Sequence, residues 1–260
     1  MDARLPVSAL LLARDETWQL EALIPALAFA REVVVVWDPR GPGETRAAAE
    51  RMGARVLPRE LDGFGGQRQF ALAQCREEWV LWIDADEWLD PAAVEALGRL
   101  AALSPPAENG FTLERRTYFL GRRIRFCGWR GERVLRLFRR ASARFDDAPV
   151  HERVLVEGRV GSLPGALEHH SYATWDDCVR KLTAYAHAGA EKARRAGRRA
   201  GALDVLLRPP LRFARMYVLQ LGFLDGFAGL VLCALAAAQV FLKYGELWAS
   251  SRDRVARERR

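Results

Sequence analysis

Short apolar runs alternate with amphipathic stretches along the first hundred residues of the chain. Four runs have the length and composition of buried strands, and they lie at residues 7–12, 33–37, 55–57 and 80–83. Helical spacing of apolar residues, with a glycine turn at residues 63–66, predicts helices at residues 18–29, 44–52, 67–74 and 91–103. Strands that alternate with helices predict a mostly parallel, Rossmann-like sheet in an α/β fold, covered on both faces.

The pattern changes after a proline-containing linker at residues 104–109. Extended pieces broken by Gly and Pro are predicted at residues 111–113, 133–138, 153–156 and 160–163. Thr174 and Asp177 resemble a capping box that opens a helix to about residue 195. Two apolar helical stretches, at residues 211–221 and 223–248, follow Pro209 and Pro210. The composition therefore predicts a first domain at residues 1–172 and a C-terminal helical region at 173–260.

Charge and cysteine content narrow the possible functions. The chain has 260 residues, and 40 Lys and Arg against 33 Asp and Glu give a net charge of +7. Much of the excess lies between residues 192 and 215 and in the tail after residue 251, which favours contact with an anionic surface, either membrane or nucleic acid. Solvated arginine-rich helices are the alternative. The four cysteines are far apart, which predicts neither a zinc site nor a disulfide framework and fits a reducing cytoplasm. No signal peptide is predicted.

Three carboxylates follow the fourth predicted strand in the stretch WVLWIDADEWLD. Asp84 and Asp86 lie two apart, so on an extended chain both side chains point to the same side. Two close carboxylates repel each other unless a cation neutralises them or one binds a proton. Hard oxygen ligands favour Mg²⁺ or Mn²⁺, often shared with phosphate oxygens. The pattern predicts a metal–diphosphate site; the alternative is that Asp84, Asp86 and Glu87 cap the helix that begins at Pro91.

Beyond these local patterns, an ordered set of motifs resembles a known family. Asp38 at the end of the second strand, followed by DGFGGQRQFALAQCREEWVLWIDADE at residues 62–87, is similar to family 2 glycosyltransferases, which have the GT-A nucleotide-sugar-binding fold. RRTYFLGRRIRFCGWRGERVLRLFRR, DDAPVHERV, LEHHSY and GFLDGFAGLVLCALAAAQVFLKYGELW resemble the bacterial β-1,4-glucosyltransferase-like branch that extends lipopolysaccharide core or related glycans. The resemblance implies a nucleotide-sugar half at about residues 1–104 and an acceptor half at about 105–172.

The same resemblance implies roles for residues on the donor side. Asp38 and Glu16 would contact the nucleoside, and Arg68 and Asp84 would lie at the diphosphate. The metal ligands would be Asp84, Asp86 and His169, although His169 is equally suited to touch the diphosphate. The sequence departs from the family in two loops. ARDE at residues 13–16 replaces the usual Asn-Glu. In DPRGPGET at residues 38–45, the usual second acid is missing or shifted to Glu44.

On the acceptor side, transfer needs a group that removes the proton of the acceptor hydroxyl. The resemblance aligns VHE at residues 150–152 with the His-Glu of the family. Glu152 is therefore the predicted base, with His151 orienting it or binding phosphate, and Asp147 and Asp146 compete for the role. Arg136 and Arg139 alternate in VLRLFRR, and they either reach phosphate or form the polar face of a half-buried strand.

The C-terminal quarter predicts attachment to a membrane. No charged residue occurs for 17 residues between Asp225 and Lys243, and Arg208, Arg212 and Arg215 alternate with apolar residues just before. A peripheral or monotopic contact with the cytoplasmic face of the inner membrane is favoured over a single span, and helices packed on the catalytic domain are the alternative.

Together, these features predict an inverting, metal-dependent hexosyltransferase. The expected donor is UDP-glucose-like, and the expected acceptor is a lipid-linked saccharide. The alternatives are transfer to a polyprenyl phosphate and a non-catalytic, membrane-bound scaffold. No nucleic-acid partner is expected, because the aromatic residues do not form an RNA-binding pattern.

Overall fold

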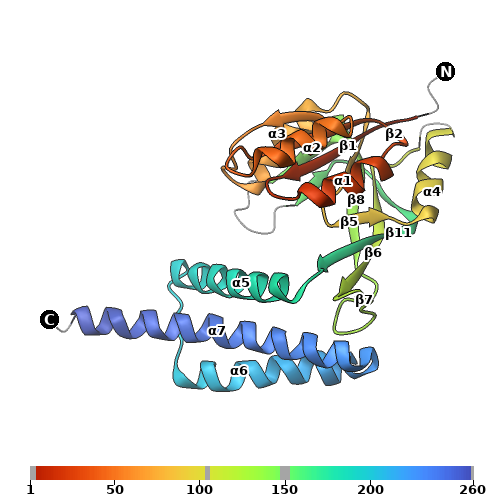
Figure 1. The fold of residues 1–260 in the computed structure, drawn as a ribbon. Helices are drawn as coiled ribbons and strands as arrows, with labels where there is room; N and C mark the ends of the chain where they lie inside the picture. Colours follow the sequence, from red (N-terminus) through yellow and green to blue (C-terminus); the bar gives the residue numbers. More distant parts are fainter. Residues whose placement is uncertain (1–3, 103–105, 147–152, 259–260) are drawn as a thin grey trace. The chain divides into compact units, whose positions relative to one another are not determined.

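The structure is a computed structural model that describes residues 4–102, 106–146 and 153–258. The chain forms two compact units, which Figure 1 shows as a ribbon. Unit 1 comprises Met1–Arg115 and Gly131–His169, and unit 2 comprises Arg116–Arg130 and His170–Arg260. Two strands, β6 (Gly110–Phe119) and β11 (Val160–Tyr172), carry the chain from one unit into the other.

The main sheet has the strand order β3-β2-β1-β4-β8-β6-β11-β5. Its first half is parallel, and its strands are β1 (Leu5–Ala13), β2 (Ala30–Trp37), β3 (Arg55–Pro58) and β4 (Trp79–Trp82). On the other side of β4, β8 (Arg133–Arg139) pairs antiparallel with both β4 and β6. Because β1, β2 and β4 run parallel, their carboxyl ends lie at one edge of the sheet, where ligands bind in open α/β folds.

Helices cover the parallel half on both faces, as the alternating pattern predicts. On one face, Ala9 and Leu11 of β1 pack with residues of α1 (Thr17–Ala26), α2 (Gly43–Arg51) and α4 (Pro91–Ala102). Leu10, which lies between them on β1, packs instead with α3 (Phe64–Gln74) on the opposite face. Side chains of a strand alternate between the two faces, so β1 contributes to both cores and is fully covered.

Short strands complete unit 1 around the sheet's antiparallel half. β5 (Glu87–Leu89) pairs antiparallel with β11, so that Glu87 lies opposite His169. β9 (Ala143–Phe145), after a 3₁₀ turn at Arg140–Ser142, pairs with β10 (Val154–Val156). β5 was not predicted, because three residues between charged positions carry no hydrophobic period of their own; the strand exists through its pairing with β11.

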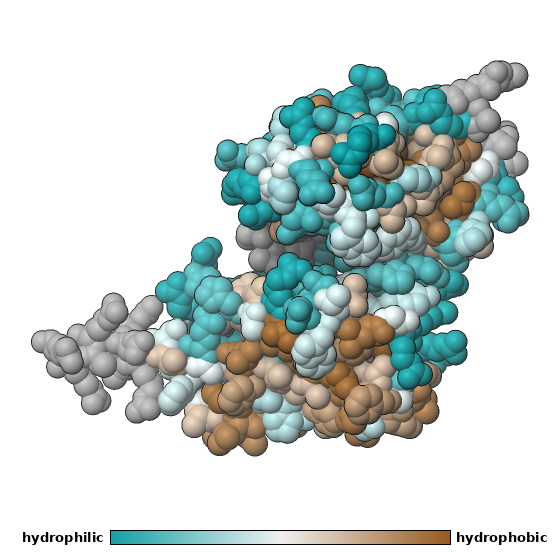
Figure 2. Space-filling model, viewed as in Figure 1, coloured by the Kyte–Doolittle hydropathy of each residue, from teal (hydrophilic) through white to brown (hydrophobic). Residues whose placement is uncertain are grey.

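Unit 2 is built around three helices and the hairpin of β6 and β7 (Arg122–Arg123). α7 (Gly226–Glu258) packs against both α5 (Trp175–Arg195) and α6 (Ala202–Ala214), and Figure 1 shows it lying between them. A π-helical turn at Arg215–Leu219 and a 3₁₀ turn at Gly222–Asp225 join α6 to α7. Figure 2 shows hydrophobic residues gathered on the visible face of this unit, over α6 and α7.

The structure corrects several predicted boundaries. α3 begins at Phe64, so the glycines expected in a turn lie inside its first turn. α6 begins at Ala202 and continues through Pro209 and Pro210, whereas the helix was predicted to start after them. The Asp204 side chain accepts a hydrogen bond from the Gly201 N–H at 3.0 Å and so fixes this earlier start. β6 and β11 are also longer than predicted, because their outer portions lack a regular apolar period.

Candidate functional site

The three carboxylates that follow β4 lie in three different environments. Glu87 is fully buried, and its carboxylate accepts the Asp84 N–H at 3.1 Å and an Arg136 guanidinium N–H at 2.6 Å. Burial raises the pKa of Glu87, while the charge of Arg136 opposes that rise. Because Glu87 is closed to solvent and holds the backbone of Asp84, it shapes the loop and is not open to a ligand.

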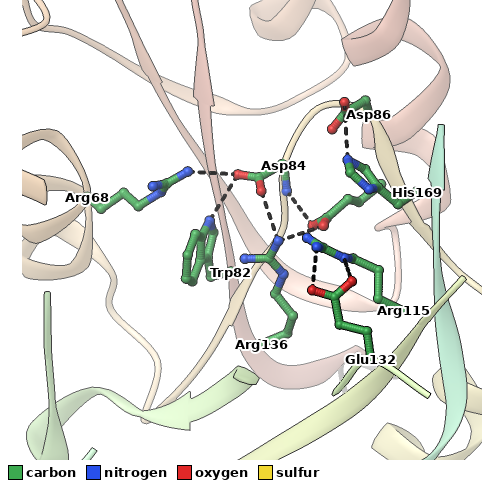
Figure 3. A network of polar contacts seen from close by, with 9 residues as sticks. Arg68, Trp82, Asp84, Asp86, Arg115, Glu132, Arg136 and His169 are labelled. Carbon is green, nitrogen blue, oxygen red and sulfur yellow. Dashed lines mark hydrogen bonds and ion pairs between the residues drawn. The ribbon is translucent and has the colours of Figure 1, made fainter. Parts of the chain in front are cut away.

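Asp84 is held by donors from three elements, as Figure 3 shows. Its Oδ1 accepts from Arg68 of α3 at 3.1 Å and from the Trp82 indole N–H at 3.2 Å. Its Oδ2 accepts from Arg136 of β8 at 2.9 Å. Burial alone would raise the pKa of Asp84, but the charges of Arg136 and Arg68 outweigh it and hold the pKa below its usual value. Asp84 is therefore a carboxylate whose charge is matched by two guanidinium groups.

Trp82 also belongs to this network, although the sequence did not predict it as a site residue. Its ring has the guanidinium of Arg68 at 4.3 Å and that of Arg136 at 4.1 Å, both within the range of cation–π attraction. Arg68 and Arg136 are both nearly buried. A tryptophan at the end of a buried strand looks like core in a sequence, so no local signal distinguished it. Its contacts hold two positive charges at the mouth of β4.

Asp86 and His169 form a second pair beside this network. His169 Nε2 lies 3.5 Å from Asp86 Oδ2, and both side chains retain some exposure. The pairing of β5 with β11 produces this contact, since it sets His169 opposite Glu87. The Nδ1 atom of His169 is buried and has no hydrogen-bond partner among the residues that the structure describes. The sequence prediction that Asp86 and His169 come together is consistent with this geometry.

The donor atoms at this site determine whether it can hold a divalent ion. Within the described residues, no three His, Cys, Asp or Glu side chains converge into a metal cluster. Asp84 turns to its arginines, while Asp86 and His169 offer one carboxylate and one imidazole. Mg²⁺ and Mn²⁺ usually take only one or two carboxylates and complete their shell with water and substrate phosphates. The Asp86–His169 pair fits that mode of binding, in which substrate and water complete the shell, and does not form a closed protein cage around the ion.

The alternative interpretation of the acidic cluster as a helix cap is not supported. Asp90 fills that position, since its Oδ1 accepts the Ala93 N–H at 2.8 Å at the start of α4. The same oxygen accepts the Ala166 N–H of β11 at 3.0 Å. Asp84, Asp86 and Glu87 are thus not needed to begin α4, and their concentration at the end of β4 calls for another explanation.

Asp38 and Glu16 follow β2 and β1 at the same sheet edge. Arg40 donates to both oxygens of Asp38, at 2.9 Å and 2.6 Å, and lowers the pKa of Asp38 to about 2. Glu16 accepts the backbone N–H groups of Arg14 and Asp15, and burial raises the pKa of Glu16. Asp38 is thus ionised and anchored, while Glu16 shapes the loop after β1.

The remaining predicted residues are the acceptor-side candidates and Arg139. Asp147, His151 and Glu152, together with the rest of residues 147–152, fall outside the described part of the chain. Arg139 lies opposite Trp79 at the start of β4, where it pairs with Glu78, so it is remote from the carboxyl end of that strand. Of Arg136 and Arg139, only Arg136 joins the network at Asp84 among the described residues.

The sequence is similar to known glycosyltransferases. The model of the family described as glycosyl transferase family 2 matches residues 20–130. The lipopolysaccharide core biosynthesis glycosyltransferase LpsC of Rhizobium meliloti (strain 1021) is 31% identical over 257 residues, covering 94% of this chain and 95% of that protein. The uncharacterized glycosyltransferase RP128 of Rickettsia prowazekii (strain Madrid E) is 23% identical, covering 93% of this chain and 86% of that protein.

Among solved structures, the fold is similar to parts of glucosyl-3-phosphoglycerate synthase from Mycobacterium tuberculosis. The form in complex with Mn²⁺, UDP and phosphoglyceric acid has a TM-score of 0.37 and 20% identity, covering 52% of this chain and 56% of that chain. The form with Mg²⁺ and UDP also has a TM-score of 0.37, with 18% identity and the same coverage.

Proposed function

The chain belongs to glycosyl transferase family 2, and we propose that it transfers a hexose from a nucleotide sugar to a lipid-linked saccharide. It is a glycosyltransferase with the GT-A fold, and its relative of near-equal length acts in lipopolysaccharide core biosynthesis. The proposed donor is UDP-glucose-like, and the proposed acceptor is lipopolysaccharide core or a related surface glycan at the cytoplasmic face of the inner membrane. Membership of an enzyme family argues against the alternative of a non-catalytic scaffold.

The observation that carries the proposal is the arrangement beyond β4. A group of two arginines, Arg68 and Arg136, joined through Asp84, lies beside the Asp86–His169 pair, at the edge where an α/β sheet binds ligands. Guanidinium groups suit phosphate oxygens in geometry and charge. The set therefore supports binding of a diphosphate more readily than binding of a neutral sugar alone.

On the donor side, the proposed roles follow from these contacts. Asp86 and His169 would hold Mg²⁺ or Mn²⁺, which supplies Lewis-acid stabilisation of the diphosphate when bound. Asp84 keeps Arg68 and Arg136 in place, and these two cations would stabilise the negative charge that develops on the leaving diphosphate. Asp38 and Glu16, on neighbouring loops, are proposed to contact the nucleoside.

On the acceptor side, Glu152 is the proposed base, with His151 orienting it and Asp147 as the competing candidate. The base removes the proton from the acceptor hydroxyl, and the oxygen of that hydroxyl then forms a bond to the anomeric carbon. The bond from that carbon to the diphosphate breaks on the opposite face, and its electron pair leaves with the nucleoside diphosphate. Such an in-line displacement inverts the anomeric configuration.

A screen of nucleotide sugars tests the donor half of the proposal. Hydrolysis of each donor is measured with Mg²⁺, with Mn²⁺ and with chelator, for wild type and Asp86→Asn. We expect a metal-dependent rate for one donor and a loss of at least about a hundredfold in Asp86→Asn, by analogy with loss of a metal-supported electrostatic contribution. Glu95→Gln, an exposed change on α4, is the control and should retain the rate. If neither ion promotes binding of any nucleotide sugar by calorimetry, the proposal fails.

The assignment of the base needs a separate comparison. Transfer to a lipid-linked acceptor is measured for Glu152→Gln and Asp147→Asn, while donor binding is followed in the same preparations. Loss of transfer with intact donor binding in Glu152→Gln alone supports Glu152. Normal turnover in that variant, with loss in Asp147→Asn, transfers the role to Asp147. Transfer to a polyprenyl phosphate but to no saccharide would favour the alternative acceptor.

A further inference from the structure

One face of α6 consists of exposed leucines. Leu203, Leu206, Leu207 and Leu211 are 53–70% exposed, and their spacing of three, four and eight residues places them on one side of the helix. The protein-facing side of α6 is different, with Pro209 buried and Phe213 packed on the core of unit 2. A helix of a soluble domain normally turns its leucine stripe inward. α6 therefore has two apolar sides, of which one lacks a protein cover among the described residues.

The exposed apolar surface continues beyond α6 through the turns that follow it and along α7. The exposed apolar side chains of the connecting segment and the first turn of α7 are Val218, Leu219, Leu221, Phe223, Leu224 and Phe227. Further along α7, exposed positions recur with helical period and all are apolar: Leu230, Ala234, Ala238, Phe241, Leu242 and Trp248. We call this combined surface of α6, the turns and α7 the anchor face. Exposed apolar residues follow one another along all three segments, and Figure 2 shows hydrophobic residues gathered over α6 and α7, unlike the scattered single residues that are normal on soluble proteins.

The packing of α7 decides how such a face meets a bilayer. Gly222–Ser251 is long and apolar enough to cross a membrane by length and composition. However, α7 is covered on one side by α5, whose sequence is rich in charged residues, and His187 of α5 contacts Glu246 of α7 at 2.8 Å. If α7 crossed the bilayer with this packing, α5 would bring its charged side chains into hydrocarbon at a high cost. The arrangement favours a helix layer that lies in the membrane plane.

Charge on the flank of the anchor face indicates the kind of surface it meets. Arg208, Arg212 and Arg215 are exposed and follow one another at helical spacing beside the leucine stripe of α6. Arginines that border an inserted apolar stripe attract the phosphates of anionic lipids. A second copy of the chain would instead bring equal charges to the rim of the interface, which is unfavourable.

We propose that the anchor face is a monotopic attachment site for an anionic phospholipid bilayer, with α6 and α7 lying in the plane of the membrane. The role rests on the proposed function only in that a lipid-linked acceptor gives the attachment its purpose. The contact itself is defined by residues of unit 2. It can therefore be tested without any knowledge of donor or acceptor.

Vesicle flotation measures the attachment directly. The full chain is mixed with vesicles of phosphatidylcholine, either alone or with about 30% phosphatidylglycerol. We expect binding to the anionic vesicles, and at least an approximately tenfold weaker partition for Leu207→Glu and for Phe227→Glu, because each places a charge where a large apolar side chain enters lipid. Trp18→Glu, at an exposed position of α1 in unit 1, is the matched control and should change binding less than about twofold.

Three outcomes would overturn the proposal. Unchanged binding of both variants, with folding verified by circular dichroism, removes the anchor face from the contact. A change from dimer to monomer in Leu207→Glu, without loss of vesicle binding, makes the face a self-association surface.

Tags at the two ends of the chain test orientation in inside-out membrane vesicles. Protease should remove both tags, and protection of the C-terminal tag alone would show that α7 spans. Donor hydrolysis, measured without vesicles, reports separately on the proposed function.

Discussion

Arg136 is the residue on which the geometry beyond β4 depends most. It is nearly buried, and its Nη2 joins Glu87 at 2.6 Å and Asp84 at 2.9 Å while its guanidinium lies over Trp82. Removing one member of a buried ion pair leaves an uncompensated charge, which usually costs more than the pair itself contributes. The network is therefore sensitive to the loss of Arg136 in two ways, through stability and through the position of Asp84.

We expect Arg136→Met to lower the free energy of unfolding by about 3–5 kcal/mol, since Glu87 stays buried without its cation. Glu87→Met in the same chain should restore part of that loss, so the double variant is more stable than the sum of the single changes indicates. Urea denaturation of the four proteins gives the coupling. Arg99→Met, from an exposed pair with Glu95, is the control and should cost less than about 1 kcal/mol. Simple additivity would show that the buried pair is not coupled.

Asp38 gives a pH dependence of known sign. Arg40 lowers the pKa of Asp38 from its ordinary value of 3.8 to about 2. The pair therefore stabilises the folded state at every pH above the pKa that Asp38 has in the unfolded chain. That contribution is lost as the pH falls from near 4 toward 2. The stability difference between wild type and Asp38→Asn should thus be constant between about pH 7 and 5 and shrink below about pH 4. Chemical denaturation across this range measures it, and a difference that grows on acidification would contradict the pairing.

At this scale, the sequence indicated individual residues better than their partners. The order of motifs pointed to Asp84, Asp86, Arg68 and His169, and the structure brings Arg68 to Asp84 and His169 to Asp86. The stack of Arg68, Trp82 and Arg136 was not predictable, because Trp82 and Arg136 are brought together only by the pairing of β4 with β8. Long-range strand pairing carries no signal in a local window of residues.

Among the elements, β11 has the most demanding fit. Gly165 has φ +85° within this strand, and a Cβ added there would lie 2.2 Å from the backbone nitrogen of Ala93 at the start of α4. The close approach lets the Asp90 carboxylate bond both Ala93 and Ala166. β11 then continues to His169, opposite Glu87 on β5. The glycine thus couples the helix start to the position of the histidine in the candidate metal site.

Gly165→Ala is expected to destabilise unit 1 by more than the strain of a positive φ alone, which is about 1–2 kcal/mol. Gly53→Ala, at φ +85° but with open space around its Cβ, provides the matched control that bears the strain without the clash. Urea midpoints of the two variants give the comparison. The shifted β11 should also weaken metal-dependent donor hydrolysis in Gly165→Ala but not in Gly53→Ala. Equal effects of the two changes would mean that β11 yields easily.

The elements also show where local patterns succeed and fail. Strands β1, β2 and β4 were predictable because each contains a run of mostly apolar, buried residues. α6 was misjudged because Pro209 and Pro210 usually mark a helix boundary. Here the helix has already begun at Ala202, and it ends in a π-helical turn shortly after the prolines. Propensity alone does not reveal a start that the Asp204 side chain fixes.

In the whole molecule, the two units divide the proposed work between them. Residues proposed to bind the nucleotide sugar and metal belong to unit 1, whereas the anchor face belongs to unit 2. The sequence predicted a boundary at residue 172, whereas unit 2 also contains Arg116–Arg130. The C-terminal arginines and apolar residues indicated a lipid surface without indicating how α7 packs. By length and composition, α7 could span a membrane. Its packing between α5 and α6 instead favours a layer of helices that lies in the membrane plane.

This division predicts that attachment and donor chemistry can be separated. Leu207→Glu should leave the rate of nucleotide-sugar hydrolysis in solution unchanged, because Leu207 lies on α6 of unit 2, whereas the residues proposed to bind the donor belong to unit 1. The same variant should lower transfer to a lipid-linked saccharide in anionic vesicles by about tenfold, in proportion to its weaker partition. Both rates are measured on one preparation, with the acceptor presented in vesicles and in detergent micelles. Recovery of transfer in micelles is expected, because a dispersed acceptor no longer requires attachment of the enzyme to a bilayer. A parallel loss of hydrolysis would instead place α6 within the catalytic machinery.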